Sequence, residues 1–142
     1  MRKIGFTFLA FFLAISAFAQ EKESTTFHAY LYNNEYEVYL NINFYDENIK
    51  VPGQELYGDL PGYLGKKNNS FVWVITSAKI KVKKTATMNL INDYGSEDLT
   101  ATLTQKNDSI YILKQESGST LKVPKNSKWQ KIPKTIELKR RK

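Results

Sequence analysis

Apolar and polar residues alternate along much of this chain with the two-residue period of a β-strand. The clearest stretch is residues 35–46, where one set of alternate positions is apolar: Tyr36, Val38, Leu40, Ile42 and Phe44. Charged residues, asparagines and tyrosines occupy the positions between them. This pattern predicts a strand with one face in a core and the other face toward solvent.

Residues 27–32 alternate in the same way and are predicted to pair with residues 35–46 as a hairpin. Asn33 and Asn34 suit a two-residue turn, because asparagine tolerates positive φ. A turn at this point sets Leu31 opposite Tyr36 and keeps the apolar residues of both strands on one face. A slip of one residue would turn the two apolar faces apart.

Two more hairpins follow from the same reasoning. Residues 71–82 form a long strand, apolar on both faces at its start, and a three-residue loop at 83–85 would pair Ile80 with Met88 and Val82 with Ala86. Strands at 99–104 and 109–114, joined through Lys106 and Asn107, would pair Leu103 with Ile110 and Ala101 with Ile112. A last strand is predicted at residues 135–139.

These elements predict an all-β fold: a single antiparallel domain of about seven to nine strands, either a barrel or a sandwich. Consecutive hairpins with short turns favour a small up-and-down barrel of the calycin kind. The analogy concerns architecture alone, because the Gly-x-Trp signature of lipocalins is absent near the first strand. The glycine-rich residues 58–67 are interpreted as a long turn at the mouth of the barrel.

The first residues have the composition of a secretory signal peptide. Arg2 and Lys3 precede an apolar run, and small residues precede Ala19, so a cut is expected between Ala19 and Gln20. The uncharged stretch is at the lower limit for a membrane span. We therefore expect residues 1–19 to be removed, and residues 20–142 to be exported to the periplasm or the exterior as one domain.

The chain contains no cysteine and only one histidine. The absence of cysteine excludes disulfides, a thiol nucleophile and a lipoprotein anchor. Without cysteine, export fits a bacterial envelope better than the outside of a eukaryotic cell, and nucleic acid is an improbable partner there.

Positive charge collects at the C-terminal end. Residues 114–142 hold ten basic and two acidic residues, against nine basic and twelve acidic in residues 20–113. Residues 139–142 are all basic and are predicted to form a basic tail. The tail either binds an anionic envelope component or only keeps the protein soluble.

The sequence offers little for catalysis or metal binding, and it predicts no enzyme, cofactor or metal. His28 lies on the predicted outer face, without a Ser and Asp to complete a triad. The acidic residues 92–98 surround Gly95 and either hold calcium or form a simple hairpin loop.

Two functional hypotheses remain, both of them non-enzymatic. The first is a carrier that binds a small apolar or amphipathic ligand inside the barrel, lined by Tyr36, Val38, Leu40, Phe44, Trp73 and Met88. The same residues would also serve an ordinary core. The second is an interaction module or inhibitor that binds an anionic glycan, lipid or protein partner through surface residues: Tyr30, Tyr32, Tyr39, Trp129, Arg140 and Arg141.

Overall fold

A computed structural model describes residues 25–142 of the chain. The signal peptide expected at residues 1–19 and its cleavage site lie outside the described residues. Within the described part, no helix is long and apolar enough to cross a membrane.

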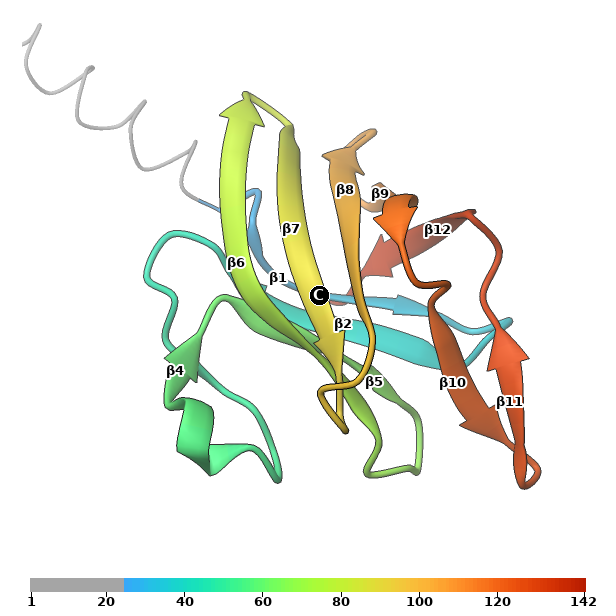
Figure 1. Cartoon of the computed structure of the whole chain (residues 1–142). Helices are drawn as coiled ribbons and strands as arrows, with labels where there is room; N and C mark the ends of the chain where they lie inside the picture. Colours follow the sequence, from blue (N-terminus) through green and yellow to red (C-terminus); the bar gives the residue numbers. More distant parts are fainter. Residues whose placement is uncertain (1–24) are drawn as a thin grey trace, which may run out of the picture.

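Eight antiparallel strands form one sheet that closes into a barrel, as the sequence predicts (Figure 1). Neighbouring strands in the barrel follow the chain in up-and-down order, and β1 closes the ring by pairing with both β2 and β12. The barrel strands are β1 (His28–Asn33), β2 (Val38–Asn43), β5 (Gly62–Lys66), β6 (Val72–Val82), β7 (Thr85–Asn92), β8 (Asp98–Gln105), β9 (Ile110–Gly118) and β12 (Thr135–Arg140).

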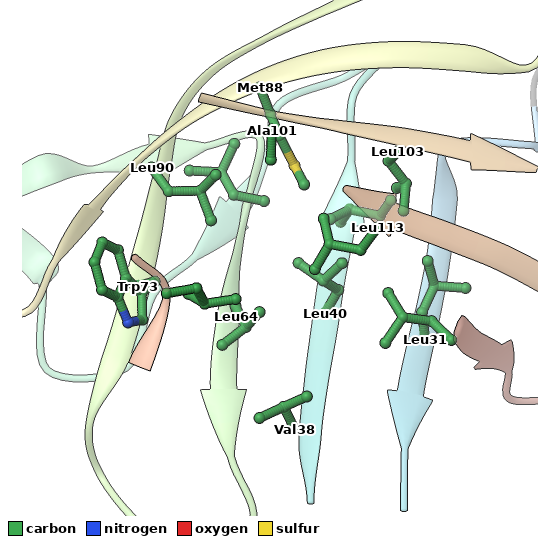
Figure 2. Packing of buried hydrophobic residues seen from close by; sticks show 14 of the residues in the cluster. Leu31, Val38, Leu40, Leu64, Trp73, Met88, Leu90, Ala101, Leu103 and Leu113 are labelled. Atoms are coloured by element: carbon green, nitrogen blue, oxygen red, sulfur yellow. The ribbon is translucent and has the colours of Figure 1, made fainter. Parts of the chain in front are cut away.

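The barrel interior is a packed core built from the alternate apolar positions of every strand. Leu31, Leu40 and Leu103 are fully buried, and Figure 2 shows these leucines pointing toward one another with Trp73, Met88 and Leu113. Each buried side chain of this size stabilises the fold by about 1.5–3 kcal/mol relative to leaving it exposed.

A second, smaller apolar cluster lies on the outer side of the barrel wall. Val51, Tyr63, Val72 and Val74 form it. The connection from β2 to β5 contains β3 (Ile49–Lys50), a 3-10 turn (Glu55–Tyr57) and β4 (Asp59–Leu60). Ile49 and Leu60 from this connection pack against the cluster. The start of β6 is therefore buried on both faces, which explains why residues 71–75 read as a continuous apolar run.

A hairpin that does not belong to the barrel covers one of its ends. It consists of β10 (Lys122–Lys125) and β11 (Lys128–Lys131), and Figure 1 shows it beside the barrel at the end where β5 turns into β6. Val123 is fully buried in the core, and the Trp73 indole Nε1–H donates to the Lys122 carbonyl at 2.9 Å. The hairpin is thus part of the core and covers its end.

The predicted register of the first hairpin was wrong by four residues. Leu31 pairs with Leu40 rather than Tyr36, and a four-residue turn, 34–37, replaces the predicted two-residue one. The Asn33 side chain accepts from the Tyr36 N–H at 2.8 Å, and Glu37 takes a φ of 56°. Because the shift is even, the same residues still face the core.

The second predicted hairpin was wrong by two residues and has a shorter turn. Val82 pairs with Thr85, and Ala86 pairs with Ile80, with irregularities in β6 near Thr76 and Lys81. Ile80 and Val82 are exposed, although their spacing predicts core positions. The pairing between β5 and β6 ends at Ile75, so the rest of β6 extends beyond the closed part of the barrel.

The predicted register of the third hairpin was wrong by three residues. Because this shift is odd, β9 turns the opposite face to the core from the one predicted. Leu103 pairs with Leu113, and Tyr111 and Leu113 point into the core instead of Ile110 and Ile112. The Asn107 side chain accepts from the N–H groups of Ser109 and Ile110 and lengthens the turn. The buried Tyr111 hydroxyl donates to the Thr26 carbonyl at 2.6 Å, which satisfies its polar end.

Two other expectations change in the structure. Residues 58–67 are not a long turn, since they contain β4 and all of β5, whose five residues are buried. Alternation is absent there because both faces of β5 are covered. At the C-terminus, Lys139 and Arg140 belong to β12, so the predicted tail 139–142 begins inside a barrel strand.

Candidate functional site

A groove with a volume of about 680 Å³ crosses the outer face of β1, β2 and β5. It lies at the end where β1 turns into β2 and β5 turns into β6. We call it the tyrosine groove and define it by its lining residues: Tyr30, Tyr32, Asn33, Asn34, Glu37, Val38, Tyr39, Lys66, Lys67, Asn68, Asn69 and Arg141.

Three tyrosines form the aromatic wall beneath and beside this groove. Tyr30 and Tyr39 stack with ring centroids 5.3 Å apart and planes 12° apart. Tyr63 meets Tyr39 edge-on at 5.8 Å. Tyr32 pairs directly with Tyr39 across β1 and β2 and is half-buried. Offset and edge-to-face pairs of this kind hold aromatic rings in fixed positions.

Gly65 determines how Tyr39 lies. The two residues are direct partners across β2 and β5. A Cβ atom on Gly65 would lie 2.5 Å from the Tyr39 hydroxyl oxygen, so the ring occupies the space that a side chain would take. A glycine opposite an aromatic residue therefore lets the ring lie flat across the neighbouring strand.

Arg141 extends the aromatic wall with a cation. Its guanidinium carbon lies 3.8 Å from the Tyr30 ring centroid, and its backbone N–H donates to the Tyr30 carbonyl at 2.9 Å. Stacking of a guanidinium on a ring leaves its N–H donors at the edge free to bind other groups. The side chain is thus held in position without using up its donors on a carboxylate.

Lys66 is buried at the base of the groove, with 5% of its surface exposed. Its ammonium Nζ lies 3.2 Å from Glu37 Oε1 and donates to the Tyr36 carbonyl at 3.0 Å. The hydrogen bond and the charge of Lys66 lower the pKa of Glu37 below its usual value. This pair compensates the buried cation and ties the β1–β2 turn to the end of β5.

Burial raises the pKa of two tyrosines of the wall, Tyr39 and Tyr30. Desolvation raises the pKa of Tyr39 to about 12, with smaller contributions from Tyr63 and Tyr30. Desolvation likewise raises the pKa of Tyr30, although the charge of Arg141 opposes it. A phenol with a pKa of 10 or above is neutral at pH 7, so Tyr30 and Tyr39 offer uncharged hydroxyl groups as donors and acceptors.

The groove carries uncompensated positive charge. Lys66 is paired with Glu37, the one acidic residue in the lining. Over residues 25–142, neither Lys67 nor Arg141 forms an ion pair with a carboxylate. Four asparagines add amide donors and acceptors around these two cations. Aromatic rings, amides and a net positive charge together make a surface suited to a polar, negatively charged ligand.

A second groove, of about 310 Å³, lies at the covered end of the barrel. We call it the tryptophan groove, after Trp129, and define it by its lining: Asn69, Ser70, Phe71, Asp93, Tyr94, Pro124, Ser127, Lys128 and Trp129. Trp129 meets Phe71 edge-on at 5.0 Å, and Tyr94 lies 6.0 Å from Phe71. Asn69 lines both grooves.

The residues predicted to hold a ligand inside the barrel are part of the core. Leu40, Trp73 and Met88 are at most 1% exposed (Figure 2), Val38 and Phe44 are also buried, and Tyr36 is half-buried against the same cluster. Phe44 stacks on Phe27 at 5.5 Å at the end opposite the β10–β11 hairpin. Each therefore has a packing role that accounts for its position.

The predicted surface residues separate into three groups. Tyr30, Tyr32, Tyr39 and Arg141 come together in the tyrosine groove, and Trp129 lies in the tryptophan groove. Arg140 has a structural role, because its guanidinium donates to the carbonyls of Thr25 and His28 and to the Tyr111 hydroxyl. These bonds fasten the start of β1 to the end of β12.

Several groove residues were not recognised from the sequence. Lys66 and Lys67 lie in residues 58–67, the predicted long turn, as does Gly65 beneath the groove; Asn33 and Asn34 were predicted only as a turn, and Asn69 was given no role. One feature of the sequence does indicate the tyrosine groove: a glycine within a strand, here Gly65, marks a position that another group approaches closely.

The acidic residues 92–98 form the β7–β8 loop. Gly95 takes a φ of 72°, and the Asn92 side chain accepts from the N–H groups of Ser96 and Glu97. Asp93 accepts a hydrogen bond from the Gln54 side chain, and Glu97 pairs with Lys122 at 2.9 Å. In residues 25–142, no three acidic or histidine side chains gather as metal ligands.

Comparisons of the chain with protein-family models, with curated proteins and with solved structures found no match, so a functional proposal depends on the geometry of the grooves.

Proposed function

We propose that this protein is an exported, non-enzymatic binding protein that holds an acidic carbohydrate in the tyrosine groove. One observation carries the proposal: a wall of stacked tyrosines lies beside two cations, Lys67 and Arg141, that form no ion pair with a carboxylate within residues 25–142. The groove is open to the surface, where a glycan chain has access.

Each part of the groove matches a part of an acidic sugar. The C–H faces of a sugar ring pack on aromatic rings, as other apolar groups do. Asparagine amides donate to and accept from sugar hydroxyls. Arg141 is fixed by Tyr30 and presents parallel N–H donors, which suit a carboxylate or sulfate oxygen pair. Lys67 supplies a second, more mobile charge.

The alternative hypothesis, an apolar ligand inside the barrel, stays a prediction and has less support. A ligand there would have to displace side chains such as Leu40 and Met88, which are at most 1% exposed and packed in one cluster. Opening space in such a core costs several kcal/mol for each large side chain that loses its contacts. The outer groove needs no such rearrangement.

Export and the lack of catalysis belong to the same proposal. The basic and apolar residues before Ala19 support export. His28 is exposed on β1, and among the described residues no hydrogen bond joins its ring to a hydroxyl or carboxylate. A general base normally needs such a partner to orient it.

Titration calorimetry with acidic oligosaccharides tests the proposal. Residues 20–142 should bind an oligogalacturonate better than its neutral methyl ester, and Arg141→Ala should weaken binding about tenfold, since a charged hydrogen bond is worth about 1.5–3 kcal/mol. Lys81→Ala removes an exposed lysine outside both grooves and should change nothing beyond a small salt-dependent effect. Equal losses from both variants would show that net charge alone attracts the ligand.

A further inference from the structure

The tryptophan groove presents large aromatic side chains to solvent, where they contribute little to the buried core. Trp129 is 49% exposed and Tyr94 is 73% exposed. Trp129 lies on β11, the outer strand of a two-stranded hairpin, opposite Pro124. The hairpin already contributes Val123 to the core, so the exposed tryptophan adds little to its burial. Exposed aromatic clusters of this kind mark binding surfaces.

The two grooves adjoin each other at one end of the barrel, where they share one lining residue. Asn69 belongs to both linings, at the turn between Lys66 of β5 and Phe71 before β6. Figure 1 shows the β5–β6 turn, the β7–β8 turn and the β10–β11 hairpin at the same end of the molecule. The charge of Lys125, at the tip of the hairpin, acts on Glu37 of the tyrosine groove.

The chemistry of the two grooves is also alike. The tryptophan groove combines a rigid edge-to-face aromatic pair, Phe71 and Trp129, with the cation Lys128 and with the polar groups of Asn69, Ser70 and Ser127. Its one acidic residue, Asp93, accepts a hydrogen bond from the Gln54 side chain. Lys122 lies 5.9 Å from the Trp129 ring centroid, and its charge is paired with Glu97 at 2.9 Å.

We infer that the ligand is an extended polysaccharide, whose chain passes from the tyrosine groove over Asn69 to a second subsite at Trp129. This inference rests on the proposed function and names the size of its ligand. Linked sugar units that fill both subsites bind more tightly than a short sugar in one, because the second contact forms within the complex. A linear polymer fits two aromatic subsites at one end of the barrel, whereas a single sugar fits only one of them.

Chain length is the variable that tests the inference. Binding of galacturonate disaccharide and hexasaccharide to residues 20–142 should be measured by calorimetry, with intrinsic tryptophan fluorescence, to which Trp73 and Trp129 both contribute, as a second signal. We expect the hexasaccharide to bind at least about tenfold more tightly than the disaccharide. Trp129→Ala should remove this advantage and leave disaccharide binding unchanged, and Trp129→Tyr should restore part of it.

Tyr57→Ala is the matched control. Tyr57 is 46% exposed, close to the value for Trp129, and lies in the 3-10 turn outside both grooves. This variant should keep the full advantage of the long chain. Thermal unfolding of each variant separates lost binding from lost fold.

Four results would overturn the inference in different ways. Equal affinity for both lengths, or an unchanged length advantage in Trp129→Ala, would remove the second subsite and leave the tyrosine groove intact. An equal loss in Tyr57→Ala would show that the effect is not specific to the tryptophan groove. No binding of either length would overturn the proposed function itself.

Discussion

Tyr39 lies flat across β5 because its direct partner there, Gly65, has no side chain. This contact between a ring and a glycine sets the position of the stacked Tyr30 and, through Tyr30, of Arg141. The groove therefore depends on a residue that contributes no chemical group to a ligand.

A single methyl group at Gly65 should disturb the aromatic wall. In Gly65→Ala, the new Cβ would overlap the Tyr39 ring and force it off the strand. We expect a loss of about 1–3 kcal/mol in unfolding free energy, the usual cost of overpacking, together with weaker glycan binding. Urea unfolding and calorimetry measure the two effects.

The double variant Gly65→Ala/Tyr39→Ala supplies the control for this prediction. Once the ring is absent, the added methyl group has nothing to displace, so the two losses should not add. Additive losses would mean that Gly65 acts through something other than Tyr39.

Tyr39 should also give the protein a distinct response to alkaline pH. Its pKa is raised to about 12 from a usual 10.0, because folding buries the neutral phenol. The stability contributed by the neutral form is complete below pH 10 and is lost as the pH rises from 10 to 12. Tyr39→Phe cannot ionise, so its stability should fall less over this range.

Ultraviolet titration of tyrosinate checks the same point directly. Wild-type protein should show a phenol that ionises near pH 12, and Tyr39→Phe should lack it. Identical titration curves for the two proteins would contradict the burial of this hydroxyl group.

At the scale of elements, one buried glutamine holds the two ends of the β10–β11 hairpin, in addition to the bond from Trp73 to Lys122. The Gln115 side chain accepts from the Leu121 N–H at 2.7 Å and donates to the carbonyls of Ile132 and Pro133. Gln115 thereby binds the segment before β10, through Leu121, and the segment after β11, through Ile132 and Pro133. The hairpin then positions Trp129 beside Phe71.

Gln115→Leu keeps the size of the side chain and removes all of these bonds. The buried Leu121 N–H would lose its partner, which costs about 1–3 kcal/mol. We expect faster hydrogen exchange at Ile132, whose N–H donates to the Leu121 carbonyl, and unchanged exchange at Leu40. Equal acceleration at both amides would mean that the whole barrel, and not the hairpin alone, is destabilised.

The strands were predicted from the sequence more accurately than the turns. The period-two pattern located the barrel strands except β5, because that pattern reports a strand with one buried face. β5 is buried on both faces and contains two glycines, so apolar and polar residues do not alternate along it. The turns were predicted less well, since the side chains of Asn33 and Asn107 set their lengths by hydrogen bonds to backbone N–H groups.

The candidate site was predictable only in part, for a related reason. Tyr30, Tyr32 and Tyr39 share the outer face of one hairpin, and the alternation of side chains along each strand is enough to place them on that face. Arg141, Lys66 and Asn69 reach the same groove through the closure of the barrel and through turns, which no local pattern reports.

At the scale of the whole molecule, the last residues of the chain close the barrel. Leu31 pairs with Arg140, Tyr32 pairs with Lys139, and Leu138 is fully buried. Removing residues 141–142 should leave a cooperative thermal transition and weaken glycan binding, because Arg141 is lost. Removing residues 138–142 should abolish the transition, since β1 would become an unpaired edge. Circular dichroism distinguishes these outcomes, and similar melting of the two truncated chains would contradict closure by β12.

In the proposed function, the ligand binds on the outside of the barrel and not within it. Nuclear magnetic resonance of side chains during titration with an acidic oligosaccharide distinguishes the two locations, because rings and methyl groups report on opposite sides of the barrel wall. We expect shifts in the Tyr30 and Tyr39 ring signals and in the Arg141 guanidinium signal, with the Met88 methyl signal unchanged. A shift of the Met88 methyl signal with unchanged tyrosine ring signals would show that the ligand binds inside the barrel.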